Sequence, residues 1–363
     1  MSNLKIRIRV EKRPITSRWL EVSISLISIL FSLTIAALFF LLQGVDPLIA
    51  YRAIFIGSFG SLSGLAHVIS KSIPLLLCGI GLVLAFKANL SNIGAEGQLI
   101  MGAIAATWIA LFAMPSAPSF IIITCMFIAG FLAGGLWALI PAILKSKFNV
   151  NEVIVTLMMN YIAFKVTEHL IYGPWRGKST WGFPQTEIFP QSAWLPCIPY
   201  TYIHYPTLII GIFLAILSQI LVSRSKIGYE LRVFGLNPEA ARYAGISYVK
   251  ISAIVMFLSG GLAGIAGVGE VAGIHHRLRY PWSISCGYGY TAIIVAWLSR
   301  LNCLATIPVS LLLGGLLVGG DAIQVILRLS VNVVHIFNGL ILLCLAGGEI
   351  LTKYRVKIVK EGS

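Results

Sequence analysis

The sequence predicts an all-α polytopic membrane protein with about ten transmembrane helices, some of them broken, arranged as an inverted repeat. Three observations lead to this fold class. Hydrophobic residues make up 58% of the 363 residues, charged residues make up only 11%, and long uncharged runs recur along the chain. A soluble domain carries about a quarter charged residues, and no soluble fold hides this much apolar surface from water.

The first span follows a basic tail, residues 1–20. The uncharged run 22–42 is long enough to cross about 30 Å of hydrocarbon, and it is longer than the core of a cleaved signal peptide. Nine further apolar runs follow at 72–87, 98–114, 120–144, 153–172, 205–223, 251–271, 284–299, 304–325 and 333–352. The transmembrane region therefore extends over 21–352, and a second tail, 353–363, follows it.

Loop charges give the direction of threading. Ten spans place both termini on the same side, and that side then holds nineteen Lys and Arg residues against six on the other. Basic residues accumulate in cytoplasmic loops, so we expect both tails inside the cell. The second, third and eighth runs are short or interrupted by glycine, as in transporter helices that line a cavity. Gly260 and Gly264 have the spacing that lets helices approach closely.

The longest inside loop, 223–250, contains the pattern of a very short helix. Asn237 suits the N-cap, Pro238 suits the first helical position, Glu239 faces the positive end of the dipole, and Gly245 suits the position after the C-cap. Such a helix is marginal alone in water, so something must hold it. Two alternatives remain: the inner surface of the protein itself, or a cytosolic partner that docks there.

A carboxylate, Glu96, stands at the start of the third apolar run between Gly94 and Gly97. A charge facing lipid is costly, so we expect a partner for it. Three roles compete. The carboxylate is solvated at the inner interface near Lys87, or it accepts hydrogen bonds from backbone N–H groups freed where the glycines break the helix, or it contacts substrate hydroxyls.

Four other polar residues are candidates for a translocation path. Asn92 and Gln98 lie near Glu96, and their side-chain amides suit a neutral ligand with several hydroxyl groups. Asn160 lies inside the fifth span. It either forms hydrogen bonds between helices or contacts a ligand. Glu270 ends a glycine-rich span five spans after that of Glu96, in the mirrored position that an inverted repeat would give.

Three segments carry a family resemblance: "FKANLSNIGAEGQLIMGA" (86–103), "KFNVNEVIVTLMMNYIA" (147–163) and "GLNPEAARYAGI" (235–246). Together they resemble the permease subunit of bacterial ABC importers of the ribose and branched-chain amino acid type, in the branch that serves nucleosides with basic-membrane-lipoprotein partners. The resemblance implies that a coupling motif docks on the ATPase, formed by Gly235, Asn237, Pro238, Glu239, Ala240, Ala241 and Gly245.

The resemblance also implies the partners and the location. We expect a second homologous permease subunit, a cytosolic ATP-binding cassette subunit, and an extracellular or periplasmic substrate-binding lipoprotein, all at the bacterial cytoplasmic membrane. ATP and Mg²⁺ belong to the partner ATPase, because this sequence has no P-loop and no loop long enough for a nucleotide-binding domain. The outer loop 173–206 is rich in Pro, Trp and Tyr. We expect it to form either an interfacial aromatic belt or a surface for the binding protein.

Other functions are disfavoured. No basic stripe interleaved with aromatics indicates nucleic acid, no cysteine or histidine spacing indicates a metal, and no convergent titratable cluster indicates catalysis. The favoured function is therefore nucleoside or purine import, with simple-sugar import as the alternative. A stand-alone secondary transporter is less favoured, because the spans lack a proton relay: Asp321 is isolated, and Lys165, Glu168 and His169 cluster at one span end.

Overall fold

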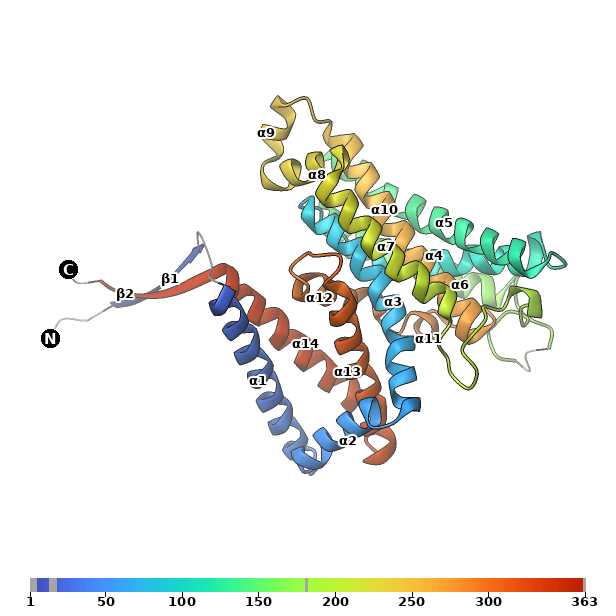
Figure 1. Cartoon of the computed structure of the whole chain (residues 1–363), viewed down its shortest axis with the longest axis horizontal. Helices are drawn as coiled ribbons and strands as arrows, with labels where there is room; N and C mark the ends of the chain where they lie inside the picture. The colour runs from blue at the N-terminus through green and yellow to red at the C-terminus, as the bar shows by residue number, and fades with distance from the viewer. Residues whose placement is uncertain (1–4, 13–17, 180–181, 362–363) are drawn as a thin grey trace. The chain divides into compact units, whose positions relative to one another are not determined.

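The computed structural model describes residues 5–12, 18–179 and 182–361, and helices make up most of them (Figure 1). The chain divides into two compact units. The central unit comprises residues 59–315, and the terminal unit comprises the two ends of the chain, up to residue 58 and from residue 316. Helix α13 (Thr306–Ile326) belongs to both.

The terminal unit pairs the two ends of the chain. Its helices are α1 (Arg18–Leu42), α2 (Pro47–Phe59) and α14 (Val331–Lys353). Buried Phe40 of α1 packs on Phe337 of α14, with ring centroids 5.0 Å apart. The segments expected as simple tails form strands β1 (Lys5–Lys12) and β2 (Tyr354–Glu361), which pair as an antiparallel sheet with Lys5 opposite Glu361.

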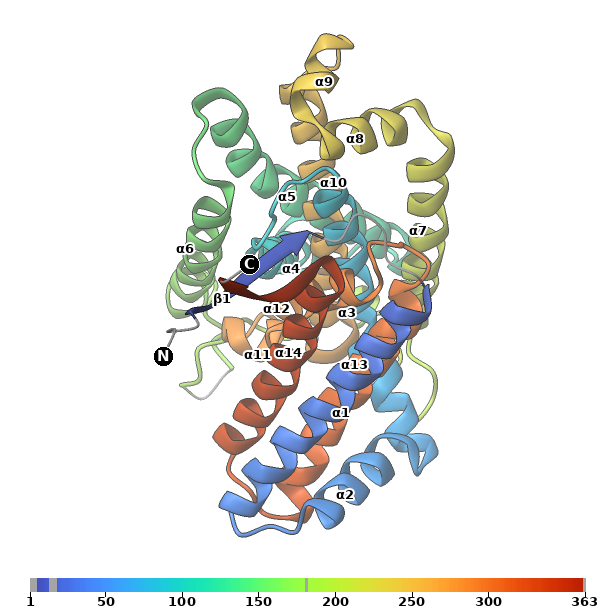
Figure 2. The ribbon, with the colours of Figure 1, turned by 90° about the vertical axis from the view of Figure 1, so that its left-hand side faces the viewer.

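The central unit is a bundle around α10 (Tyr248–Glu270). Its other long helices are α3 (Leu62–Lys87), α4 (Ala95–Trp108), α5 (Ser119–Phe148), α6 (Glu152–Tyr172) and α7 (Tyr205–Arg224). Its shorter elements are α8 (Lys226–Leu236), α9 (Pro238–Tyr243), α11 (Pro281–Ser285), α12 (Tyr288–Leu298), the 3-10 turn η2 (Gln191–Ala193) and the π-helical turns η1 (Ile109–Ala113) and η3 (Val271–His275). Helices α8 and α9 lie at one end of this unit, called the α9 end below (Figures 1 and 2).

Among the described residues, six helices are long and apolar enough to cross a membrane, or seven if Leu30–Leu42 and α2 are one span bent by 115°. The expected number of about ten is not confirmed. The other expected runs correspond to α6, which carries charged residues, to α11 and α12, and to α14. The second run is not short, since α3 has 26 residues. The third ends in η1, and the eighth is split between α11 and α12.

Glycines let α10 touch its neighbours backbone to backbone, which confirms the predicted close packing. A Cβ atom added at Gly264 would lie 2.1 Å from the carbonyl oxygen of Gly130 on α5. One added at Gly102 of α4 would lie 2.2 Å from the carbonyl oxygen of Gly264. A methyl group at Gly264 would therefore push the backbones of α10 and α5 apart.

We expect Gly264→Ala to lower the free energy of unfolding by about 1–3 kcal/mol, because overpacking shifts backbone here rather than a flexible side chain. Thermal unfolding in detergent measures this loss. Gly339→Ala is the matched control, because a Cβ there meets nothing within 4 Å. Equal melting temperatures for the two variants would contradict the packing role of Gly264.

Candidate functional site

The chain enters α4 from deep inside the central unit. After α3 ends at Lys87, the Asn92 Nδ2 atom donates a hydrogen bond to Ser259 Oγ of α10 at 3.0 Å. Ser259 lies eleven residues after Tyr248, where α10 begins, which is about 16 Å along the helix. The start of α4 therefore lies well inside the bundle, away from the α9 end.

The Glu96 carboxylate binds the first backbone N–H groups of α12. The side chain is fully buried, and it accepts hydrogen bonds from the Gly287 N–H at 3.1 Å and the Gly289 N–H at 2.6 Å. A helix N-terminus carries unpaired N–H groups and a partial positive charge, which together stabilise an anion. The helix comes very near the carboxylate's own backbone, since a Cβ at Gly289 would lie 2.3 Å from the Glu96 nitrogen.

This geometry separates the three roles expected for Glu96. Solvation at the interface is wrong, because the residue is 0% exposed. The carboxylate does accept from freed backbone N–H groups, but they belong to α12 and not to α4. The N–H groups of Gly94 and Gly97 are instead bound by Asn92 Oδ1 and Asn160 Oδ1, each at 2.9 Å. Contact of Glu96 with substrate stays a prediction.

Three buried amides bind one another or the backbone on either side of Glu96. We call these four residues the central polar cluster: Asn92, Glu96, Gln98 and Asn160. The Asn92 and Gln98 side chains exchange two hydrogen bonds of 3.0 Å. Asn160 donates to the carbonyl oxygen of Ile93 at 2.9 Å and to the Tyr290 hydroxyl at 3.2 Å. The cluster joins α4, α6, α10 and α12 through protein–protein hydrogen bonds. The structure thus places four of the five path candidates together.

Glu270, the fifth candidate, lies elsewhere. It is the last residue of α10, 2% exposed, and its Oε1 atom has no hydrogen-bond partner among the described residues. The positive charge of Lys71 on α3 acts on it. Sequence reasoning missed His204 and Thr207, at the start of α7, which pack against Gly269 and Gly273 and are fully buried with polar atoms that have no partner among the described residues. No local sequence signal marks a buried His before a helix as different from an exposed one.

The expected short helix in the loop 223–250 is present as α9. Asn237 caps it, since its Oδ1 accepts from the N–H groups of Glu239 at 3.0 Å and Ala240 at 3.1 Å. Pro238 is its first residue, and Gly245 follows its C-cap with φ +76°. Exposed apolar side chains flank it, with Leu236 at 88% and Tyr243 at 94% exposure.

Of the remaining residues of the predicted coupling motif, some are packed against the bundle and others are exposed. Gly235, the last residue but one of α8, lies against the end of α3, where an added Cβ would lie 2.0 Å from the Lys87 carbonyl oxygen. Ala241 is fully buried, whereas Ala240 is exposed beside Glu239. The segment is therefore anchored on one side and open on the other.

The described residues of the loop 173–206 are held by the chain that follows α10. The N–H groups of Thr186, Phe189 and Leu195 donate to carbonyl oxygens of residues 278, 276 and 272, at 2.8–3.0 Å. The Trp194 ring stacks on His276 with centroids 4.0 Å apart. Hydrogen bonds from the Ser179 hydroxyl and N–H lower the pKa of the Glu187 carboxyl below its usual value. The described part of the loop is thus an ordered surface.

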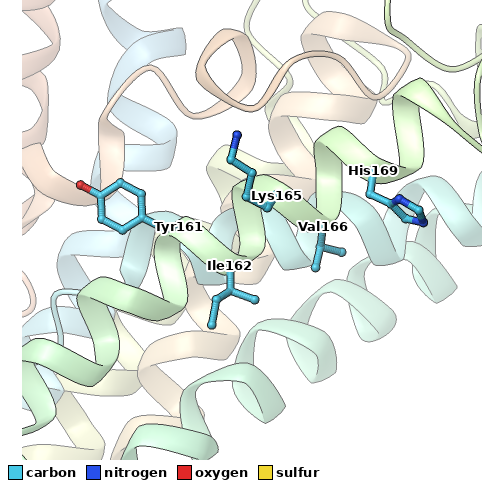
Figure 3. Close-up of a pocket in the computed structure, with 5 residues that line it drawn as sticks. All are labelled: Tyr161, Ile162, Lys165, Val166 and His169. Atoms are coloured by element: carbon cyan, nitrogen blue, oxygen red, sulfur yellow. The ribbon is translucent and has the colours of Figure 1, made fainter.

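One pocket of about 430 Å³ lies along α6, lined by Tyr161, Ile162, Lys165, Val166 and His169 (Figure 3). All five side chains come from a single helix, so the pocket is a shallow groove on its outer face. It contains none of the predicted path residues. Within the described part of the chain, no group of three His, Cys, Asp or Glu residues is placed to hold a metal ion.

The sequence matches the family "Branched-chain amino acid transport system / permease component" over residues 64–346. The chain belongs to this family, so it is a membrane transport subunit of an ABC transporter and not itself an enzyme. It is 32% identical to the glucose ABC transporter permease protein TsgB13 of Haloferax volcanii, over 98% of this chain and 95% of that one.

Two further relatives have nucleosides in their names. The chain is 32% identical to the guanosine ABC transporter permease protein NupP of Bacillus subtilis, over 94% of this chain and 97% of that one. It is 29% identical to the nucleoside ABC transporter permease protein NupB of Lactococcus lactis, over 82% of each chain. The family resemblance expected from the three motifs is confirmed.

We expect Glu96→Gln to lower the free energy of unfolding by about 1–3 kcal/mol, because an amide offers one acceptor oxygen to two buried N–H donors and turns an NH₂ group toward one of them. Thermal unfolding of the purified chain measures it. Glu230→Gln is the control, because Glu230 only faces exposed Lys226 at 3.9 Å, a pair worth less than about 0.5 kcal/mol. A Glu96 variant as stable as this control would show that the carboxylate does not cap α12.

Proposed function

We propose that this chain is a permease subunit of an ATP-binding cassette importer that moves nucleosides or related purine compounds across the bacterial cytoplasmic membrane by alternating access. The observation that carries the proposal is α9, a capped helix whose one face is anchored and whose other face is open. A six-residue helix is marginal without a partner surface. The partner is the cytosolic ATPase, which holds ATP and Mg²⁺, so the α9 end faces the cytoplasm.

The remaining parts of the importer follow from this orientation. Both termini are cytoplasmic, in agreement with the excess of Lys and Arg on that side of the threading. The loop 173–206 faces outward, and a substrate-binding lipoprotein delivers cargo to it. Its described residues are held by backbone bonds to residues 272–278. A second, similar permease completes the pathway. The central polar cluster and Glu270 are the candidate residues along it.

The nucleoside assignment is supported by the names of two relatives, and a sugar is the second candidate because a third relative is a glucose permease that aligns over almost the whole of both chains. Both ligands are neutral and carry several hydroxyl groups. The amides of the central polar cluster match such ligands better than fixed charges would.

The substrate class is tested by uptake into proteoliposomes that contain this chain, its second permease, the ATPase and the binding lipoprotein. We expect ATP-dependent accumulation of labelled guanosine, competed by unlabelled nucleosides and not by glucose. Accumulation of glucose alone would favour the sugar alternative. Accumulation by this chain without any ATPase would contradict the importer assignment.

The docking role of α9 is tested by Leu236→Asp with Tyr243→Asp. Both side chains are exposed, so we expect the melting temperature of the permease to stay unchanged, while co-purification of the ATPase falls at least tenfold because two apolar contacts become buried charges. Tyr200→Asp is the control, a fully exposed tyrosine in the loop 173–206. An ATPase that still co-purifies with the double variant would refute docking at α9.

A further inference from the structure

The break between α11 and α12 lies deep in the bundle. Helix α12 ends beside the end of α3, because its Trp297 stacks on Phe86 with ring centroids 5.2 Å apart. That end of α3 lies against Gly235 of α8, at the α9 end. The eleven residues of α12 span about 16 Å. The break at 286–287, where both residues have positive φ, therefore lies about halfway across a hydrocarbon core of about 30 Å.

One side of this break is exposed. Trp282 is 50% exposed, and Ser283 and Cys286 are exposed beside it. Lipid offers no hydrogen bonds to the backbone groups that a broken helix leaves unpaired. Non-helical backbone at membrane depth is tolerated only where protein buries it or where it lines a water-filled cavity. The exposed side of the break therefore faces water or another protein chain, and not lipid.

The surface at the break continues onto α6. The Phe164 ring of α6 lies 5.7 Å from the Trp282 ring of α11, measured between centroids. Asn160 of α6 donates to the Tyr290 hydroxyl of α12 at 3.2 Å. Helices α11 and α12 thus both pack on α6, and the side chains of α6 next to these contacts belong to the same surface as the break.

Two of those α6 side chains are well exposed. Tyr161 is 57% exposed and the Lys165 side chain is 77% exposed, and Figure 3 shows both on the same side of the helix. Tyr280, just before α11, acts electrostatically on Lys165, and Tyr161 acts in the same way on Tyr290. A charged side chain within a span faces a protein interior or a water-filled cavity, because lipid solvates it poorly. This side of α6 therefore also faces water or protein.

The aromatic residues of this surface are called the aromatic wall: Tyr161, Tyr280, Trp282 and Tyr290. An interfacial belt of aromatic residues lies at the level of the lipid headgroups. Tyr161 is instead the tenth of the 21 residues of α6, and Tyr290 is the third residue of α12, next to the break. Two of these rings thus lie near the middle of the membrane, where an interfacial belt does not explain them.

An aromatic wall suits a cargo with a planar ring. Nucleic-acid bases stack on tyrosine and tryptophan side chains, and phenol hydroxyls both donate and accept hydrogen bonds. A nucleoside has a planar base and several hydroxyl groups, whereas a simple sugar has hydroxyl groups and no planar ring. Lys165 beside the wall is paired with Glu168 at 2.6 Å, so the pair adds no net charge and a neutral cargo fits.

We propose that the aromatic wall lines the water-filled translocation path and stacks on the base of a nucleoside that passes along it. Tyr161 and Trp282, the most exposed of the four rings, make the stacking contacts. This inference rests on the proposed importer function. It adds the surface that contacts the cargo and the part of the cargo that this surface recognises.

Native Cys286 reports whether water reaches the break. The complete importer in lipid nanodiscs is treated with a charged, water-soluble methanethiosulfonate during ATP hydrolysis, and peptide mass spectrometry follows the modification of this chain. We expect Cys286 to react at least tenfold faster than the new cysteine in Leu132→Cys, which is 44% exposed near the middle of α5. Equal rates at the two positions would overturn the assignment of the break to a water-filled path.

Substitutions that remove or keep a ring test the stacking in proteoliposomes that contain the complete importer. Tyr161→Leu and Trp282→Leu remove the ring, and Tyr161→Phe and Trp282→Phe keep one. The probes are labelled guanosine and labelled glucose, and the measured quantity is molecules accumulated per ATP hydrolysed. Losing a stacked ring weakens binding of a base about fivefold or more. We expect the guanosine ratio to fall about fivefold in the Leu variants and to stay within twofold of wild type in the Phe variants.

Phe213→Leu is the matched control, because Phe213 is 60% exposed on α7, and its ratio stays at the wild-type value. Tyr161→Leu alone decides the test if Trp282→Leu, which loses its contact with Phe164, does not assemble. A wild-type ratio in Tyr161→Leu would overturn the stacking, and so would equal losses in Tyr161→Leu and Tyr161→Phe. A wild-type importer that accumulates glucose and not guanosine would also overturn it. Accumulation of neither probe would instead contradict the proposed function.

Discussion

The central unit depends on one interaction, the Glu96 carboxylate at the N-terminus of α12. On insertion scales a charged side chain in the middle of a membrane costs about 2.5–3.5 kcal/mol, and a helix that begins there leaves N–H groups unpaired. The two costs offset each other, because the carboxylate accepts hydrogen bonds from the N–H groups of Gly287 and Gly289. The chain reverses just before α12, at Cys286 and Gly287, both with positive φ. This contact makes an eleven-residue half-helix possible.

Contacts with α4, α5 and the central polar cluster hold α10 in the bundle. Its glycines bring its backbone against α4 and α5, and its Ser259 accepts a hydrogen bond from the central polar cluster. Helix α7 is different, because much of its surface is exposed, including Ile209 at 61% and Phe213 at 60%. It is bound to the bundle mainly along one side. A force applied at α9 therefore displaces α7 more readily than α10.

The sequence predicted the features that depend on residues close together in the chain. The cap of α9 depends on residues 237–245 alone, and all of its features were predictable from them. The grouping of Asn92, Glu96 and Gln98 also follows from their spacing. The partner of Glu96 was not predictable, since its N–H donors lie 191 and 193 residues away. The pairing of β1 with β2 brings together the two ends of the chain, and no local pattern reveals that.

The two buried polar regions differ in how many of their polar atoms have hydrogen-bond partners. Each member of the central polar cluster is hydrogen-bonded to the protein, so moving any member breaks bonds that already exist, and the cluster resists conformational change. His204 and Thr207 of α7 pack against α10 with polar atoms that have no partner among the described residues, so separating α7 from α10 costs few hydrogen bonds there. A transporter needs both kinds of region. Rigid contacts transmit a movement from one end of a helix to the other, and two helices separate most easily where few hydrogen bonds join them.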